Sequence, residues 1–257
     1  MEPSGLSQSL PWLLQWETFV LLIGGFVIGI FSVVVGGGFF FSIPLFQWLF
    51  PRASYGVLVG NLKVGSFFRG IGSTWENRKE IDFVPNIIWS IPLLIGTVLG
   101  VMAIAHLDQR WILPAMIAAV LLAEYAPKIV HRITPRYFYG ASVLTGAYSG
   151  FLGAGIGIML VALVRLKRPE DEKIAQVEIQ ARFIEWFIGI IAVIVHFLHG
   201  NLILALWLVW SVGGFVGGIV GGKLLRTLGT MPGRAQKMIL HGVYVVALIT
   251  AVMPFLR

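Results

Sequence analysis

Residues 29–44 read GIFSVVVGGGFFFSIP, so three consecutive glycines, Gly36, Gly37 and Gly38, interrupt an apolar run. The run extends over residues 18–50, which is too long for a single membrane crossing of about 20 residues. Each glycine weakens a helix by about 1 kcal/mol relative to alanine, so a helix is expected to break here. Broken backbone within lipid must face protein or a water-filled cavity, so the break is predicted to point inward.

A second stretch repeats this pattern 117 residues later, where residues 146–161 read GAYSGFLGAGIGIMLV. The matching positions are Gly29 and Gly146, Ser32 and Ser149, Gly36 and Gly153, and Gly38 and Gly155. Ala154 takes the place of the middle glycine, and the surrounding apolar run, 137–164, is again too long for one crossing. The chain is therefore predicted to contain the same broken segment twice.

Composition places the protein in a membrane. Hydrophobic residues make up 57% of the 257 residues and charged residues only 12%, about half the share in soluble domains. This balance excludes water-soluble enzymes, nucleic-acid-binding proteins and secreted scaffolds, and the net charge of +7 is assigned to cytoplasmic loops. The chain has no cysteine, no HExxH, no GxSxG and no P-loop, so neither a metal nor another cofactor is predicted.

The apolar runs and the loop charges together predict an architecture. The runs are 18–50, 55–75, 83–105, 111–127, 137–164, 174–198, 202–222 and 238–256. If both long runs enter the membrane and return, 13 of the 19 Lys and Arg residues lie in loops on one face, as the positive-inside rule favours. Each half then has an odd number of crossings, so the halves are inverted. Glycines spaced by four are expected to allow close helix packing, and these are Gly96, Gly100, Gly214, Gly218 and Gly222.

The predicted fold is an all-α polytopic membrane protein made of two inverted repeats, each a glycine-broken helical hairpin followed by three transmembrane helices. The predicted segments are a non-cytoplasmic N-terminal stretch 1–17, a first repeat 18–127, a cytoplasmic linker 128–136 and a second repeat 137–257. Both chain termini are expected outside the cytoplasm. Inverted repeats with broken helices are typical of secondary transporters, whose substrates bind near the midplane.

Candidate binding residues lie at the two breaks and within the apolar spans. Freed amides and helix N-termini attract anions, and ionisable residues within spans are costly unless they serve a function. The predicted substrate-binding set is Ser32, Gly36, Gly37, Gly38, Asn61, Lys63, Ser66, Ser149, Gly153, Ala154, Gly155, Gln180 and Arg182. Glu178 and Glu185 lie on the same helical face as Arg182 and are predicted to carry a coupling proton.

The stretch from Gly29 through the three glycines to Pro44 resembles the first motif of the TauE/SafE sulfite exporters. The later Ile81-Asp82-Phe83 and the pair Gly96 and Gly100 fit the same pattern, and the resemblance covers residues 20 to 255. In the second half Ala154 and Val161 replace the middle glycine and the proline. The resemblance implies transport, commonly export, of sulfite, sulfoacetate or a related organosulfonate, coupled to protons.

The leading hypothesis is a multi-pass secondary transporter of a bacterial inner membrane, with a small sulfur-containing anion, a proton and the lipid bilayer as its partners. Which anion is carried and the oligomeric state stay open. A passive anion channel is the first alternative. The second is an intramembrane enzyme using Glu124, His131 or His241, which is weakened because no nucleophile, base and orienting group share one motif.

Overall fold

The computed structural model describes residues 16–104, 114, 137–151, 156–168 and 172–228. The predicted spans 111–127 and 238–256 and the linker 128–136 lie outside these residues, apart from position 114. The same holds for the N-terminal segment before residue 16. Glu124, His131 and His241, named for the enzyme alternative, are also outside the described part of the chain.

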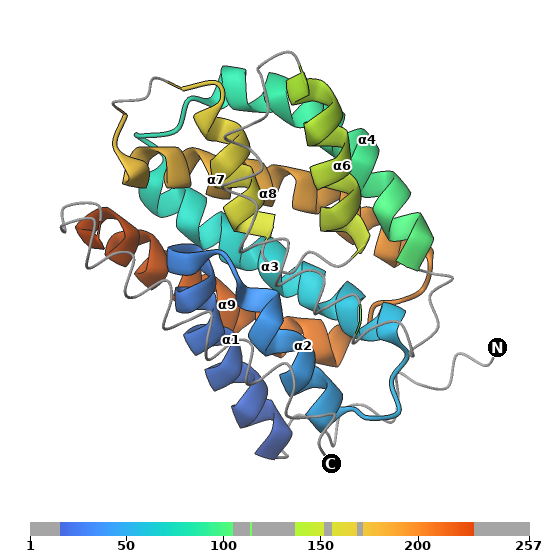
Figure 1. Cartoon of the computed structure of the whole chain (residues 1–257). Helices are drawn as coiled ribbons and strands as arrows, with labels where there is room; N and C mark the ends of the chain where they lie inside the picture. Colours follow the sequence, from blue (N-terminus) through green and yellow to red (C-terminus); the bar gives the residue numbers. More distant parts are fainter. Residues whose placement is uncertain (1–15, 105–113, 115–136, 152–155, 169–171, 229–257) are drawn as a thin grey trace.

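The described residues form helices and no strands (Figure 1), as the sequence predicts. Their order is α1 (Trp16–Val35), α2 (Gly38–Leu49), α3 (Tyr55–Asn77), α4 (Phe83–Ile104), α6 (Phe138–Phe151), α7 (Ile156–Arg165), α8 (Ile174–Leu198) and α9 (Leu204–Leu228). One order of elements therefore occurs twice: a helix, a short helix and two long helices. The repeated elements follow the 117-residue offset of the sequence closely.

Both long apolar runs are divided where the glycines predict. The first run separates into α1 and α2, and the chain turns between them at Gly36, whose φ of 85° favours glycine. The second run separates into α6 and α7, with residues 152–155 between them. Pro44 lies inside α2 and Pro92 inside α4, and both helices continue through their proline.

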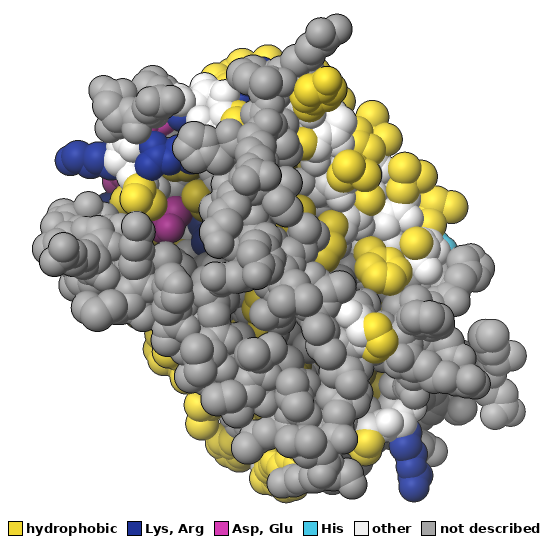
Figure 2. Space-filling model, in the orientation of Figure 1, with side chains coloured by type: hydrophobic (Ala, Val, Ile, Leu, Met, Phe, Trp, Pro, Cys, Tyr) yellow, Lys and Arg dark blue, Asp and Glu magenta, His cyan; other side chains and the backbone are white. Residues whose placement is uncertain are grey.

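Within the described residues, four helices, α1, α4, α8 and α9, are long and apolar enough to cross a membrane. Their large apolar side chains are exposed where no other helix covers them, as on the α4 and α6 edge in Figure 2. The 23-residue helix α3 is long enough as well but carries Lys63, Arg69 and Glu76. Its polar side chains are tolerated because α8 and α9 pack against it and bury Lys63 and Arg69.

The two halves pack crosswise. Helix α1 of the first half lies against α9 of the second, and α6 of the second half lies against α4 of the first. Glycines permit both contacts, because a Cβ on Gly96 would meet the α6 backbone and a Cβ on Gly213 would meet the α1 backbone. The expected close packing at Gly96, Gly100, Gly214, Gly218 and Gly222 is confirmed. Gly213 and Gly217, which match Gly96 and Gly100 at the exact offset, form the corresponding contact with α1.

Each short helix is buried against the long helix that follows it. In the first half, Phe39, Phe40 and Ile43 of α2 share an apolar cluster with the N-terminal part of α3. In the second half, Ile156 and Leu160 of α7 share a cluster with α8. Burial of apolar surface thus fixes the start of each short helix inside the protein, where the helix breaks occur.

Ion pairs join the halves at one end of the molecule, where lysine and arginine side chains gather in Figure 2. Arg168 on the α7–α8 connection pairs with Asp82 on the α3–α4 connection, with Nη1 and Oδ2 2.6 Å apart. Arg226 near the end of α9 pairs with Glu76 near the end of α3. These contacts place the α3–α4 and α7–α8 connections at the same end.

Candidate functional site

The first helix break meets the start of α7, the helix that follows the second break, inside the protein. A Cβ added to Gly36, at the end of α1, would lie 3.2 Å from the Cα of Gly157, in the first turn of α7. It would also lie 2.8 Å from Nη2 of Arg182. A Cβ at Gly36 or Gly157 would crowd Arg182 and the other glycine, so the close approach of the first break to the start of α7 favours glycine at both positions.

Arg182, on α8, holds the end of the first broken helix. Its Nε donates a hydrogen bond of 2.8 Å to the backbone oxygen of Val33, and its side chain is 6% exposed. The carbonyl groups in the last turn of a helix have no partner within the helix and carry its negative dipole end. A cation from the second half therefore satisfies the end of α1 in the first half.

Lys63, on α3, holds the end of α6, the helix that precedes the second break. Its Nζ donates a hydrogen bond of 2.5 Å to the backbone oxygen of Ser149, in the last turn of α6. The ammonium group also lies 4.8 Å from the ring centre of Phe39, at the start of α2. Each half thus supplies one cation to the interrupted helix of the other half.

A carboxylate links the two central helices beside the breaks. Glu185 of α8 pairs with Arg69 of α3, Oε1 to Nη2 3.1 Å, and with Arg182 of its own helix, Oε2 to Nη1 3.0 Å. Arg69 was not among the predicted site residues. A signal was present, because Arg69 and Glu185 are 116 residues apart, one short of the repeat offset, and so occupy nearly equivalent positions on equivalent helices.

The predicted serines lie near this cluster. Ser32 is buried, and its Oγ lies 2.5 Å from the place of a Cβ on Gly38, at the start of α2. Ser149 contributes its backbone oxygen to Lys63, as described above. Ser66 is half-buried on α3, three residues after Lys63, and so shares its helix face.

Asn61 and Gln180 bind the connections between helices. The amide of Asn61 donates to the backbone oxygen of Asn201 and accepts from the backbone N–H of Ile203, just before α9. Gln180 accepts from the backbone N–H of Asp82 and the side chain of Asn86, and donates to the backbone oxygen of Glu80. The two side chains therefore fasten equivalent connections, those that lead into α9 and α4.

The remaining predicted residues are Glu178 and the second glycine cluster. Glu178 lies one turn before Arg182 on α8 and makes no hydrogen bond or ion pair with the described residues, whereas Arg182 pairs with Glu185. Gly153, Ala154 and Gly155 lie outside the described residues. The structure thus brings together Ser32, Gly36–Gly38, Lys63, Ser149, Arg182 and Glu185 and adds Arg69.

The cluster carries an excess of positive charge. Lys63, Arg69 and Arg182 are all buried, and Glu185 is the one carboxylate among the described residues that pairs with any of them. Neither Nη1 of Arg69 nor Nη2 of Arg182 has a hydrogen bond to a described residue. The first N–H groups of α2 and α7 also lack partners within their helices. Such a set of donors suits a small oxyanion.

Comparison with known proteins supports this chemistry. The family model described as Sulfite exporter TauE/SafE matches residues 21–252, nearly the whole chain. No curated protein and no solved structure matches the chain significantly. The family match spans both broken segments, the crosswise helix pairs and every described residue of the charged cluster. The chain therefore belongs to the TauE/SafE sulfite exporter family.

Proposed function

We propose that this membrane transporter is a secondary carrier that exports a small sulfur-containing anion, such as sulfite, sulfoacetate or a related organosulfonate, together with proton movement. The anion binds where the two broken helices meet and becomes accessible to each side of the membrane in turn. The observation that carries the proposal is the contact of the two breaks beside three buried cations, Lys63, Arg69 and Arg182.

The arrangement of the connections supports an inverted relation of the repeats, 18–127 and 137–257, joined by the linker 128–136. The α2–α3 connection corresponds by offset to the α7–α8 connection. The α2–α3 connection lies at the N-terminal end of α3. The ion pair of Arg168 with Asp82 places the α7–α8 connection at the C-terminal end of α3. Corresponding connections at opposite ends are what inverted repeats require. The basic end then faces the cytoplasm, and both chain termini face outward across a bacterial inner membrane.

The binding site that we propose is narrower than the sequence suggested. Arg69 and Arg182 offer planar donors that match the oxygens of sulfite or a sulfonate group, and Ser32 and the amides of Gly37 and Gly38 add neutral donors. Lys63, whose ammonium group contacts the last turn of α6, adds positive charge. Asn61 and Gln180 act mainly by holding the connections, because their amides are already hydrogen-bonded there.

The coupling proton is assigned to the carboxyl groups beside the arginines. Glu185 is in direct contact with Arg69 and Arg182, and Glu178 lies one turn away on α8. A proton on one of these groups changes the net charge of the site when the anion enters or leaves. Anion and proton movements are then linked through a shared electrostatic environment.

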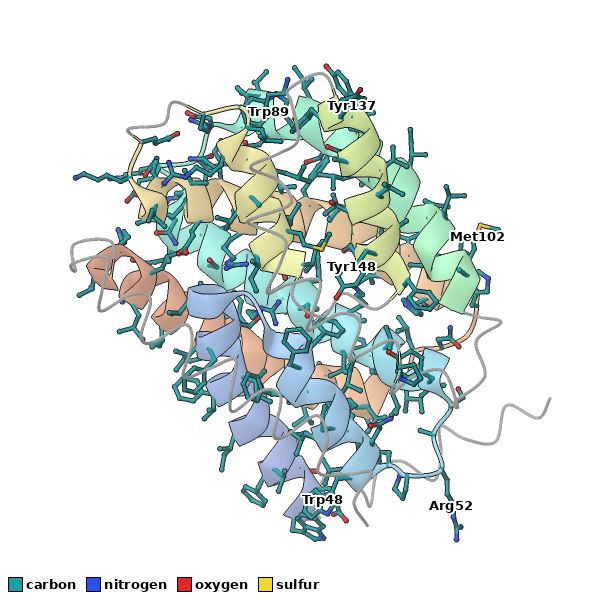
Figure 3. All side chains as sticks on the ribbon, in the orientation of Figure 1. Trp48, Arg52, Trp89, Met102, Tyr137 and Tyr148 are labelled. Atoms are coloured by element: carbon teal, nitrogen blue, oxygen red, sulfur yellow. The ribbon has the colours of Figure 1, made fainter. Side chains whose placement is uncertain are left out.

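The test is transport by the full-length protein in liposomes. Labelled sulfite, sulfoacetate and taurine are offered with and without an imposed pH gradient. We expect saturable uptake that responds to the gradient for at least one anion and falls more than about tenfold in Arg182→Gln, since a charged hydrogen bond is worth about 1.5–3 kcal/mol. Arg52→Ala is the control, because Arg52 is exposed at the far end of the molecule (Figure 3).

Three results would contradict the proposal. Single-channel currents without saturation would identify a passive channel. Chemical turnover of the anion in detergent would identify an enzyme. Equal uptake by wild type and a folded Arg182→Gln would remove the site from the transport path.

A further inference from the structure

The carboxylate of Glu185 occupies the position that an oxyanion would be expected to take. Its two oxygens each accept from a different arginine, Arg69 on α3 at 3.1 Å and Arg182 on α8 at 3.0 Å. A sulfite or sulfonate group has the same chemistry, with oxygens that accept paired N–H donors. The side chain of Glu185 is 16% exposed, more than either arginine, so it is the most accessible member of the group.

We infer that Glu185 is a built-in competitor of the transported anion: it bridges Arg69 and Arg182 when the site is empty and is displaced when the anion binds. This inference rests on the proposed function and specifies how its site is regulated. The energetic reason is that two buried guanidinium groups without an anion are costly. A side-chain carboxylate reduces that cost in the empty protein, and the substrate must replace it.

Displacement of Glu185 couples anion binding to proton uptake. Once the anion lies between the arginines, an ionised Glu185 beside it would place two negative charges together, so the displaced carboxyl group takes up a proton. One proton is bound at Glu185 as one anion binds, and the same proton leaves when the carboxylate returns. The net charge of the site therefore changes less than it would if the anion bound without the proton.

The groups around Glu185 are consistent with this exchange. Helix α3 presents Arg69 and also Lys63, which interacts electrostatically with Glu185. Helix α4 has no charged or titratable side chain. The charged residues of the other helices packed on α8 lie at their ends: Arg165 of α7 bonds the backbone of Glu172, and Lys223 and Arg226 are in the last turns of α9. On α8 itself, Arg182 and Glu178 are the nearest charged residues in sequence.

The experiment compares Glu185→Gln with Glu80→Gln, the same substitution on the α3–α4 connection, where the carboxylate lies 4.0 Å from Arg226 and outside the charged cluster. Both variants are made in the full-length protein. Glutamine keeps the size of the side chain but carries neither the negative charge nor the proton. We expect Glu185→Gln to bind sulfite about tenfold more tightly than wild type. It should exchange labelled for unlabelled sulfite across liposomes but fail to accumulate it in response to a pH gradient. Glu80→Gln should accumulate sulfite as wild type does.

A second variant, Glu185→Asp, keeps the charge and the proton but shortens the side chain, so that it reaches only one arginine at a time. It should bind sulfite more tightly than wild type and retain the response to the pH gradient. Sulfite binding no tighter than wild type in Glu185→Asp, or accumulation preserved in Glu185→Gln, would overturn the inference. If the wild type moves neither sulfite nor sulfoacetate, the proposed function itself fails.

Discussion

Substitution of Gly36 by alanine tests the contact between the two helix breaks directly. Gly36 has a φ of 85°, a conformation that costs a residue with a Cβ about 1–2 kcal/mol. The new Cβ would also lie 2.8 Å from Nη2 of Arg182 and 3.2 Å from the Cα of Gly157. Overpacking of this kind adds about 1–3 kcal/mol. The expected loss of stability is therefore about 2–5 kcal/mol.

The same substitution is expected to impair transport beyond its effect on folding. The nearest atom is the end of the Arg182 side chain, so the guanidinium group should move away from Val33 and Glu185 rather than the backbone. Thermal unfolding of the purified protein measures stability, and sulfite uptake per folded molecule in liposomes measures function. We expect uptake per folded molecule to fall at least about tenfold, which corresponds to 1.4 kcal/mol.

Gly189→Ala is the matched control. Gly189 lies within α8, the helix that carries Arg182, and a Cβ there would meet no atom within 4 Å. Alanine should stabilise the helix by about 0.5–1 kcal/mol and leave uptake unchanged. If Gly36→Ala unfolds at the same temperature as wild type and transports at the same rate, the two breaks do not meet as described.

Three further predictions concern contacts between the halves. Lys63→Met removes the charge and the hydrogen bond to the backbone oxygen of Ser149, so sulfite uptake should fall at least about tenfold while the protein still inserts in membranes. Gln180→Leu leaves two polar partners unsatisfied, the backbone N–H of Asp82 and the side-chain amide of Asn86, whereas the backbone oxygen of Glu80 still accepts from Gln176. Thermal unfolding should therefore show a loss of about 2–4 kcal/mol, with sulfite affinity unchanged in the folded fraction. A double-mutant cycle on Arg226→Ala and Glu76→Ala should give a coupling free energy of about 0.2–1 kcal/mol that decreases with salt, because the pair is partly exposed; a salt-independent value would contradict its surface character.

The sequence predicted the fold of the described part well because its strongest signals are local. Three consecutive glycines in an apolar run require a break, and the structure breaks there, with α2 starting at Gly38. Helix α8 has the predicted bounds, 174–198, and α3 and α4 end within two residues of theirs. Apolar length and polar interruption are properties of neighbouring residues, so they can be recognised without knowledge of the tertiary structure.

The site was predicted less completely, because partners distant in the chain decide what a polar side chain does. Arg69 was not among the predicted site residues, because its partner, Glu185, lies on the equivalent helix of the other half. Asn61 and Gln180 were assigned to the anion because they lie in apolar spans. Their hydrogen bonds instead go to connections that the sequence alone could not place beside them.

The crosswise packing of the halves limits how this transporter changes shape. Backbone-to-backbone glycine contacts hold α1 to α9 and α4 to α6, and such tight seams resist sliding or separation. If these contacts persist during transport, the α1–α9 pair and the α4–α6 pair each move as one unit, and each pair contains one helix from each repeat. The two units are in contact through α3, which packs on α9, and α8, which packs on α4, and these are the two helices that carry the charged cluster.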